Sequence, residues 1–425
     1  MSGTHGAGAA LRSRDFRLLW IAQGISQTGD SLTWLALILT INRLTGSTTM
    51  IATLSVVLAL PQLVLGLFAG VMADRWNRRR TMIGSDLLRA AIVLGFLLVR
   101  GPEDLWLLYL LGLLHVVVSV FFSPARAALT PALVAPDALL SANSLLQTTQ
   151  IVSGLAGTAL AGVLIPMAKS GWPAFALDAV SFAASAACVA GMSASAGVPD
   201  AGSSPAKSGS RRGVMRDLRD GLSLVLGTRA LLAIVMAFGV ASLGTGAVGV
   251  LFVPFLVNTL HLPAASVALA KGAQVGGLLI GGAWVARSGM ARSNAALVGG
   301  GLAGIGLATV FLGASPGLAA VLGSMLLLGL CATPMQSATN ALLQRRTPNA
   351  MLGRVEATVD TLLLAVMMGS MAWAGVLADR VGIRAVLYGA GILCLAGGAA
   401  GWALLTRVRV SGRSAAEGEP TIESG

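Results

Sequence analysis

The sequence predicts an all-α membrane protein with twelve transmembrane helices, and three observations support this fold class. First, 55% of the 425 residues are hydrophobic and only 11% are charged, whereas a soluble domain has roughly 25% charged residues. Second, apolar stretches of about 20 residues recur along the chain, each long enough to cross a hydrocarbon core of roughly 30 Å. Third, basic residues gather in alternate loops between these stretches.

The apolar stretches are predicted to be helices because lipid offers backbone groups no other hydrogen-bonding partner. We expect them at approximately 17–42, 50–73, 82–100, 104–125, 141–166, 172–192, 230–257, 264–286, 293–313, 316–340, 354–379 and 383–406. The chain has 54 glycines. Glycines four residues apart inside such stretches, for example Gly66 and Gly70, permit close contact between helices.

The net charge of +12 is explained by membrane topology rather than by nucleic-acid binding. The basic residues of every second loop are Arg12, Arg14, Arg17, Arg75, Arg78, Arg79, Arg80, Lys207, Arg211, Arg212, Arg216, Arg219, Arg287, Arg292, Arg345, Arg346, Arg354, Arg407, Arg409 and Arg413. The intervening loops offer little beyond Arg43, Arg100, Lys169, Arg380 and Arg384. This bias predicts a multi-pass protein of the cell membrane with both termini in the cytoplasm. We therefore expect a lipid bilayer as partner and no nucleic acid.

The predicted helices divide the chain into two halves. We expect a cytoplasmic N-terminus at 1–16, a six-helix half at 17–192, a cytoplasmic linker at 193–229, a second six-helix half at 230–406 and a disordered cytoplasmic tail at 407–425. Within the linker, Arg211–Thr228 has apolar residues at helical spacing opposite charged ones, which predicts an amphipathic helix on the membrane surface. The three cysteines lie singly in apolar segments and are interpreted as packing residues.

A related phrase recurs at the end of every third predicted helix. The four copies are Gly70-Val-Met-Ala-Asp74-Arg75, Gly162-Val-Leu-Ile, Gly282-Ala-Trp-Val-Ala-Arg287 and Gly375-Val-Leu-Ala-Asp379-Arg380. The spacing is nearly equal within each half, and the linker lengthens the gap between the halves. The pattern predicts four three-helix units, alternately inverted and grouped in two halves.

The phrase from Gly66 to Arg80, which lies between the second and third predicted helices, resembles the signature loop of the major facilitator superfamily. The segments Ser13–Trp20, Gln27–Ser31, Leu139–Ser144 and Gly353–Val355 are similar to a bacterial exporter branch that includes the enterobactin exporter and macrolide-efflux-like proteins. The resemblance covers nearly the whole chain. It implies the fold of that superfamily and the export of a small molecule.

The signature loop predicts a cytoplasmic latch between the halves. Its residues are Gly70, Asp74, Arg75, Arg78 and Arg79, with Asp86 and Arg89 placed to extend the ionic network into the third helix. A latch of this kind is made in one state of the cycle and broken in the other. The alternative is that these charges determine topology and take no part in gating. The corresponding loop of the second half lacks the aspartate, so we expect any latch to be asymmetric.

Polar residues repeat on one face of several predicted membrane helices. The first helix carries Gln23, Gln27, Asp30 and Trp34, the fourth His115 and Ser119, the fifth Asn143 and Gln147, and the tenth Gln336 and Asn340. Buried polar groups need a partner or a cavity, so these residues predict a central water-accessible site. The alternative is that the amide side chains form hydrogen bonds that hold the bundle together.

Asp30 is the strongest functional candidate. It lies about 20 Å along a helix that enters from the cytoplasm, close to the bilayer midplane, where an ionised carboxylate is costly and its proton is expected to be exchangeable. His115 is the second candidate because histidine titrates near neutral pH. Lys271 is placed to hold an anionic group or to pair with Asp30. The alternative for Asp30 and for His115 is a purely structural, hydrogen-bonded role.

We expect a monomeric secondary transporter that exports a small organic molecule, such as a drug, siderophore or secondary metabolite, by alternating access. Proton antiport and multidrug resistance are the expected chemistry and phenotype. Many proton-coupled antiporters have an arginine in the middle of the fourth helix, whereas this chain has none there before Arg126. Two alternatives are an importer on the same fold and a membrane sensor or secretion partner that transports nothing.

An enzymatic function is not expected. The glycine-rich phrase Gly244–Gly249 lies in an apolar helix and follows no strand. The chain lacks a phosphate-binding Gly-Lys-Ser/Thr loop, which favours an ion gradient over ATP as the energy source. No cofactor and no metal are expected. The nearly uncharged polar stripes favour a neutral or amphipathic substrate.

Overall fold

The structure, a computed structural model, describes residues 8, 10–73, 76–193, 211–288, 294–347 and 351–416. Within these ranges the chain is helical and contains no strand. The long helices of the N-terminal part are α2 (Arg14–Thr45), α3 (Thr48–Ala73), α4 (Arg78–Gly95), α5 (Leu105–Leu133), α6 (Leu139–Ala168) and α7 (Trp172–Ala190). Short 3-10 turns lie at η1 (Phe96–Leu98), η2 (Pro102–Asp104) and η3 (Pro136–Ala138).

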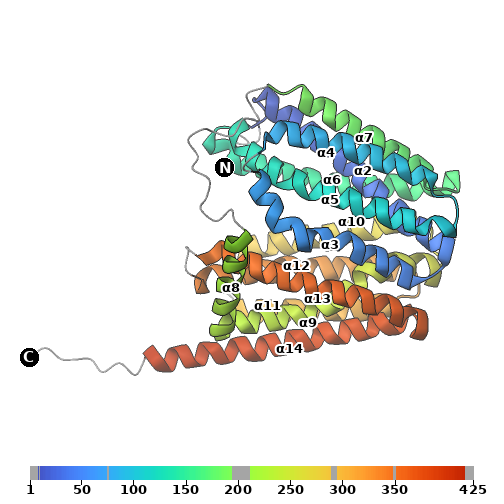
Figure 1. Cartoon of the computed structure of the whole chain (residues 1–425). Helices are drawn as coiled ribbons and strands as arrows, with labels where there is room; N and C mark the ends of the chain where they lie inside the picture. The colour runs from blue at the N-terminus through green and yellow to red at the C-terminus, as the bar shows by residue number, and fades with distance from the viewer. Residues whose placement is uncertain are drawn as a thin grey trace, which may run out of the picture. The chain divides into compact units, whose positions relative to one another are not determined.

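The C-terminal part contains a further seven helices among the described residues. They are α8 (Arg211–Gly227), α9 (Arg229–Pro254), α10 (Ala265–Ser288), α11 (Asn294–Ala314), α12 (Leu318–Arg346), α13 (Leu352–Val381) and α14 (Ile383–Ala416). A π-helical turn, η5 (Phe255–Thr259), extends α9. All twelve predicted transmembrane helices are therefore present, and α8 is the predicted linker helix (Figure 1).

Two of the twelve long helices are less apolar than the rest. Ten helices in the described ranges are long and apolar enough to cross a membrane, judged by length and composition, and α2 and α10 are not among them. Asp30 lies within α2 and Lys271 within α10. Because charged residues inside membrane helices are costly, they mark the helices where function is to be sought.

Chain contacts divide the protein into two compact units. Unit 1 consists of Met1–Gly209 together with Val253–Gly272, and unit 2 of Ser210–Phe252 together with Ala273–Gly425. The segment Val253–Gly272 thus groups with the N-terminal helices, although it belongs to the second half of the sequence. Asn42 on α2 and Asn258 on η5 contribute to this grouping, since their amides exchange two hydrogen bonds of 2.8 and 2.7 Å.

In unit 1 the first long helix, α2, packs closely against both α6 and α7. Gly29 faces α7 so closely that a Cβ atom built on it would overlap the side chains of Asp178 and Ser181. On the other side, a Cβ atom on Gly157 of α6 would overlap the backbone oxygen of Thr28. Glycine permits this spacing, which places the middle of α2 against its two neighbours.

Unit 2 repeats the arrangement with its own first helix, α9. A Cβ atom on Gly244 would lie 2.6 Å from the backbone oxygen of Ala390 on α14. A Cβ atom on Gly246 would lie 2.7 Å from the backbone oxygen of Met367 on α13. The first helix therefore contacts the fifth and sixth helices in both halves, as expected for the repeat predicted from the sequence.

The third and sixth helices of each half also pair, as α4 with α7 and as α11 with α14. The α11–α14 seam is built from glycines that face each other. Cβ atoms built on Gly299 and Gly398 would each approach the backbone oxygen of the other residue, at 3.0 and 2.8 Å. Gly306 and Gly391 repeat this relation one level along the seam, at 2.8 Å in both directions. The two helices are thus in backbone-to-backbone contact, as small residues allow within a membrane.

The amphipathic helix differs from the prediction in one respect. The sequence predicts a helix lying on the membrane surface, whereas one face of α8 packs against α13. Val225 is buried there and clusters with Val355 and Val359. The apolar residues of α8 are thus shared between a protein contact and an exposed surface, since a long helix can bury apolar area on more than one side.

Candidate functional site

The site is built on α2, which Ser13 and Gly46 delimit. The Ser13 hydroxyl caps the helix by accepting a hydrogen bond of 3.3 Å from the Phe16 amide, and Gly46 ends it in the left-handed conformation with φ of 65°. Of the predicted polar face, Gln23 is buried while Gln27 and Trp34 are half-buried. The side chain of Asp30 is 36% exposed. Asp30 therefore lies between the helix packing and an accessible surface.

Asp30 has two partners from two other helices. Its Oδ1 atom lies 3.2 Å from Nε2 of His115 on α5, and its Oδ2 atom lies 3.6 Å from Nη1 of Arg89 on α4. The His115 side chain is 13% exposed. The two strongest sequence-predicted candidates thus lie in direct contact. Arg89 joins them as a third member.

Arg89 is buried in unit 1. Only 3% of its side chain is exposed, and it forms an ion pair with Asp86 one turn earlier on α4. Its guanidinium carbon lies over two aromatic rings, 4.6 Å from the centroid of Phe122 and 4.3 Å from that of Phe182. Such rings attract a cation through their negative faces. Arg89 is thus held between two carboxylates and two aromatic rings.

Asp30, Asp86, Arg89 and His115 form one charged cluster, and Asp86 is its most buried member. It is fully buried, and Ser185 on α7 donates a hydrogen bond of 2.6 Å to its Oδ2 atom. Two carboxylates and one guanidinium leave one negative charge in excess when both acids are ionised and His115 is neutral. One proton on any of these groups would balance the cluster, so the arrangement is suited to taking up and releasing a proton.

A further carboxylate, Asp178, lies on α7 and is fully buried. Thr33 donates a hydrogen bond of 2.5 Å to its Oδ2 atom, and Ser181 donates one of 3.1 Å to its Oδ1 atom. Within the described residues no cation lies at ion-pair distance from it. Asp178 therefore ties α7 to α2 directly beside Asp30.

The predicted signature loop is only partly described. Asp74 and Arg75 lie outside the described residues, and Gly70 is described only as part of α3. Arg78 donates a hydrogen bond of 3.1 Å to the Ala128 oxygen, and Arg79 donates one of 3.1 Å to the Val189 oxygen. Val189 lies in the last turn of α7, where a cation interacts favourably with the free carbonyl groups.

The structure separates Asp86 and Arg89 from these loop arginines. The sequence predicts that the pair extends the loop network, but their partners are Asp30, Ser185 and each other. The buried face of α4 consists of Met82, Ser85, Asp86, Arg89, Ile92 and Val93. This spacing of three and four residues was the available signal for a buried position. The partners Phe122, Phe182 and Ser185 were not predicted.

The fourth predicted helix has no arginine in its middle, and the buried guanidinium beside Asp30 belongs to Arg89 on α4. Arg126 is half-buried, and its Nη1 atom donates a hydrogen bond of 3.0 Å to Gln23 Oε1. Gln27 also donates to Gln23, at 3.1 Å. Helices α2 and α5 are thus linked at two places along their length, through Gln23 with Arg126 and through Asp30 with His115.

The remaining predicted residues have other surroundings. Lys271 does not pair with Asp30, since its ammonium group lies 3.9 Å from the centroid of the Trp34 ring. Asn143 and Gln147 are exposed on α6, and Ser119 is half-buried on α5. Gln336 and Asn340 belong to unit 2, where the first donates a hydrogen bond of 3.2 Å to the second.

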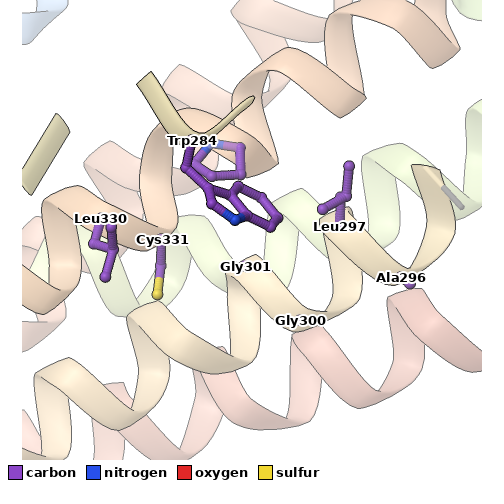
Figure 2. Close-up of a pocket in the computed structure, with 8 residues that line it drawn as sticks. Trp284, Ala296, Leu297, Gly300, Gly301, Leu330 and Cys331 are labelled. Carbon is purple, nitrogen blue, oxygen red and sulfur yellow. The ribbon is translucent and has the colours of Figure 1, made fainter. Parts of the chain in front are cut away.

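Unit 2 contains a separate hollow of about 360 Å³ between α10, α11 and α12 (Figure 2). Its lining consists of Trp284, Ala296, Leu297, Gly300, Gly301, Leu330, Cys331 and Pro334. None of these lining residues carries a charge. The hollow therefore suits an apolar group.

Comparisons with known proteins agree with the fold. The chain is 29% identical to macrolide efflux protein A of Streptococcus pyogenes over 151 residues, 35% of this chain and 37% of that protein. It is 34% identical to YfiS, an uncharacterized MFS-type transporter of Bacillus subtilis, over 152 residues, 35% of each chain. The matches thus span only about a third of the length of these curated relatives.

A solved structure of a bacterial homologue of the human lysosomal transporter Spinster matches with a TM-score of 0.73. That match covers 93% of this chain and 97% of the other at 12% identity, so it speaks for the fold alone. The profile of the Major Facilitator Superfamily matches residues 19–363, which include the whole cluster around Asp30. The chain therefore belongs to the Major Facilitator Superfamily of membrane transporters.

Proposed function

We propose that this transporter exports a small organic molecule in exchange for protons, with Asp30 as the exchanging carboxylate. The observation that carries the proposal is the double contact of a half-exposed Asp30 with His115 and with the buried Arg89. A group that exchanges protons must reach water on one side and sense the protein on the other. The 36% exposed fraction of the Asp30 side chain and its contacts with Arg89 and His115 support this role.

The charge of the cluster supplies the coupling. Protonation of Asp30 removes its attraction to Arg89, whose ion pair with Asp86 remains. The contact between α2 and α4 is therefore weaker in the protonated state, while Arg89 stays held on α4. Helix α2 also packs on α6 and α7. Loss of the attraction between Asp30 and Arg89 therefore changes which position α2 prefers among its neighbours, and α2 carries the residues proposed to face the substrate. If the proton binds one of the two conformations of the transport cycle more tightly, protonation raises the population of that conformation.

The proposed direction is export, and the proposed substrates are neutral or amphipathic organic molecules that include macrolides. The partial similarity to macrolide efflux protein A supports this choice. We further propose a monomer in the cell membrane with both termini in the cytoplasm, on the basis of the alternating basic loops.

The test is transport into everted membrane vesicles that contain the full chain, with a radiolabelled macrolide and a panel of lipophilic dyes. The imposed gradient makes the vesicle interior acidic. Wild-type protein is expected to accumulate at least one compound, and a protonophore is expected to abolish the accumulation. Asp30→Asn should reduce the uptake to that of vesicles without the protein, because an amide cannot exchange the proton.

The matched control is Asp137→Asn, the same chemical change at an exposed position before α6. It should leave uptake unchanged. Uptake by Asp30→Asn that still responds to the gradient would refute the role of Asp30. Accumulation only when the gradient is reversed would refute export.

A further inference from the structure

A polar cavity of about 290 Å³ lies at one end of unit 1. Arg43, near the end of α2, and Arg100, between η1 and η2, both line it, as does Trp172 at the start of α7. Helix α4 begins at Arg78 and ends before Arg100, so this end lies opposite the loop arginines. In the topology proposed above it faces away from the cytoplasm. The bias of basic residues toward cytoplasmic loops therefore does not account for these two arginines.

The two arginines are not neutralised within the described part of the chain. Arg43 donates a hydrogen bond to the backbone oxygen of Lys169, which has no formal charge. Asp104 accepts a hydrogen bond of 2.8 Å from the backbone amide of Arg100, but no described carboxylate lies at ion-pair distance from either guanidinium. The described residues that line the cavity include no aspartate and no glutamate. Two cations that share one cavity repel each other unless an anion lies between them.

Thr40 provides an independent observation at the same cavity. It is one of the lining residues and is only 8% exposed. Thr28 and Thr45 on the same helix each donate a hydrogen bond to the backbone oxygen four residues earlier, at 2.8 and 2.9 Å. The Thr40 hydroxyl forms no hydrogen bond with any described residue. A buried hydroxyl without a partner costs free energy, so this group is suited to a ligand that supplies the partner.

The start of α7 adds further hydrogen-bond donors. A Cβ atom built on Gly171 would lie 2.9 Å from the Thr40 hydroxyl oxygen, which places that hydroxyl beside the first turn of α7. The Ser170 hydroxyl and the Trp172 backbone amide also have no hydrogen-bond partner among the described residues. Guanidinium groups, hydroxyls and the free amides of a helix start are the groups that bind phosphate oxygens. The Trp172 side chain is 57% exposed, as is typical of tryptophan at the level of lipid headgroups.

We propose that this cavity binds a phosphate group. The guanidinium groups of Arg43 and Arg100 contact its oxygens from two sides, and the Thr40 hydroxyl donates the hydrogen bond that it lacks within the protein. The phosphate belongs to an anionic phospholipid or to a free phosphate ion, and both offer the same oxygens. The bound group ties the end of α2 to the chain before α5 and to the start of α7. The site does not depend on what the protein transports.

The test uses the full chain, purified in a neutral detergent and freed of lipid. Native mass spectrometry counts the phosphatidylglycerol molecules that the protein retains during a titration, with phosphatidylcholine as the lipid without net charge. In a second arm, the thermal unfolding midpoint is measured in inorganic phosphate and in sodium chloride of equal ionic strength, with no lipid present. Preferential retention of phosphatidylglycerol assigns the phosphate to a lipid. A higher midpoint in inorganic phosphate assigns it to the free ion.

Variants identify the cavity as the place of binding. Arg43→Gln together with Arg100→Gln should weaken binding at least about tenfold, because charge-assisted hydrogen bonds to both guanidinium groups are lost. The corresponding double change to lysine should retain most of the binding, because it keeps both charges. Thr40→Val, which removes only the hydroxyl, should weaken binding by a smaller factor. Arg380→Gln is the matched control, since it makes the same change at an exposed arginine in the last turn of α13.

Three results would overturn the proposal. The first is a wild-type protein that neither prefers phosphatidylglycerol nor gains stability from inorganic phosphate. The second is binding that persists unchanged in the double glutamine variant. The third is an equal loss in Arg380→Gln, which would assign the binding to the overall positive charge of the protein instead of to this cavity.

Discussion

At the scale of single residues, the central feature is a guanidinium held in the interior of a helix bundle. The charge of Arg89 is balanced by Asp86 and Asp30 and by the faces of Phe122 and Phe182. A buried ion pair gains little over apolar packing, because desolvation offsets the attraction, but removal of one partner leaves a buried charge uncompensated. The cluster is therefore sensitive to any change that alters its charge.

Arg89→Met is expected to lower the free energy of unfolding by about 3–5 kcal/mol, since it leaves Asp86 buried without its cation. Unfolding in mixed detergent micelles, followed by far-UV circular dichroism, measures the change. The double variant Arg89→Met with Asp86→Leu should recover part of the loss because it removes both charges. Arg100→Met, at an exposed position, is the control. A loss no larger than that of this control would contradict the role of Arg89.

His115→Gln is expected to keep transport but to change its dependence on pH. The glutamine amide can donate a hydrogen bond to Asp30 in place of the ring nitrogen, but it cannot take up a proton as an imidazole can. The measurement is the initial rate of uptake into everted vesicles at several external pH values. His261→Gln, an exposed histidine outside the cluster, should leave the profile as in the wild type. An unchanged profile in His115→Gln would show that His115 only orients Asp30.

At the level of single residues, polarity alone singled out two side chains that the structure brings into contact. Asp30 and His115 stand out because each is a titratable group inside an apolar stretch. The sequence predicts that Arg89 extends the loop network because it lies within the first turns of the helix that follows the loop. The contacts of Phe122 and Phe182 with Arg89 depend on tertiary packing. The sequence does not distinguish an aromatic residue that contacts a cation from one that only packs against lipid or other helices.

At the scale of elements, glycines set how closely the helices approach. Gly246 on α9 lies against Met367 and Ser370 of α13, where a Cβ atom would be 2.7 Å from the Met367 oxygen and 2.9 Å from the Ser370 Cβ. Gly239 lies on the same helix with no neighbouring heavy atom within 4 Å of such a Cβ. The two glycines form an internal pair for comparison.

Gly246→Ala is expected to destabilise the protein by about 1–3 kcal/mol, because the added methyl group meets backbone that cannot rotate away. Gly239→Ala should be neutral or stabilising by up to about 1 kcal/mol, since alanine has the higher helix propensity. Thermal unfolding of the purified protein in detergent, followed by light scattering and intrinsic fluorescence, compares the two. Equal midpoints would contradict close packing between α9 and α13.

The linker helix shows what periodicity can and cannot predict. The helical spacing of apolar residues in Arg211–Thr228 predicts α8 correctly. It does not distinguish a lipid partner from a protein partner, because both offer apolar surface to the same residues. The close contact with α13 occurs at Gly221, but Gly213 and Gly227 lie in the same stretch, and a glycine in an amphipathic stretch is equally typical of a turn or of a helix end.

At the scale of the whole molecule, hydropathy and repeats predicted most of the fold. Lipid requires continuous helices of a fixed length, so ten of the twelve long helices in the described ranges follow from hydropathy alone, and α2 and α10 do not. The recurring glycine phrase predicted the internal repeat, and both units show its packing. The grouping of Val253–Gly272 with the N-terminal helices was not predicted. It depends on contacts such as Asn42 with Asn258, between residues far apart in the sequence.

The glycine seam between α11 and α14 has a consequence for how this sequence can change over time. At Gly299, Gly306, Gly391 and Gly398 the neighbouring atoms include backbone of the opposite helix, so an added methyl group cannot be accommodated by changing a side chain nearby. At ordinary core positions, a larger side chain at one residue can be compensated by a smaller side chain at its neighbour. These four positions have no such route, and descendants of this chain must retain them or rebuild the whole interface at once.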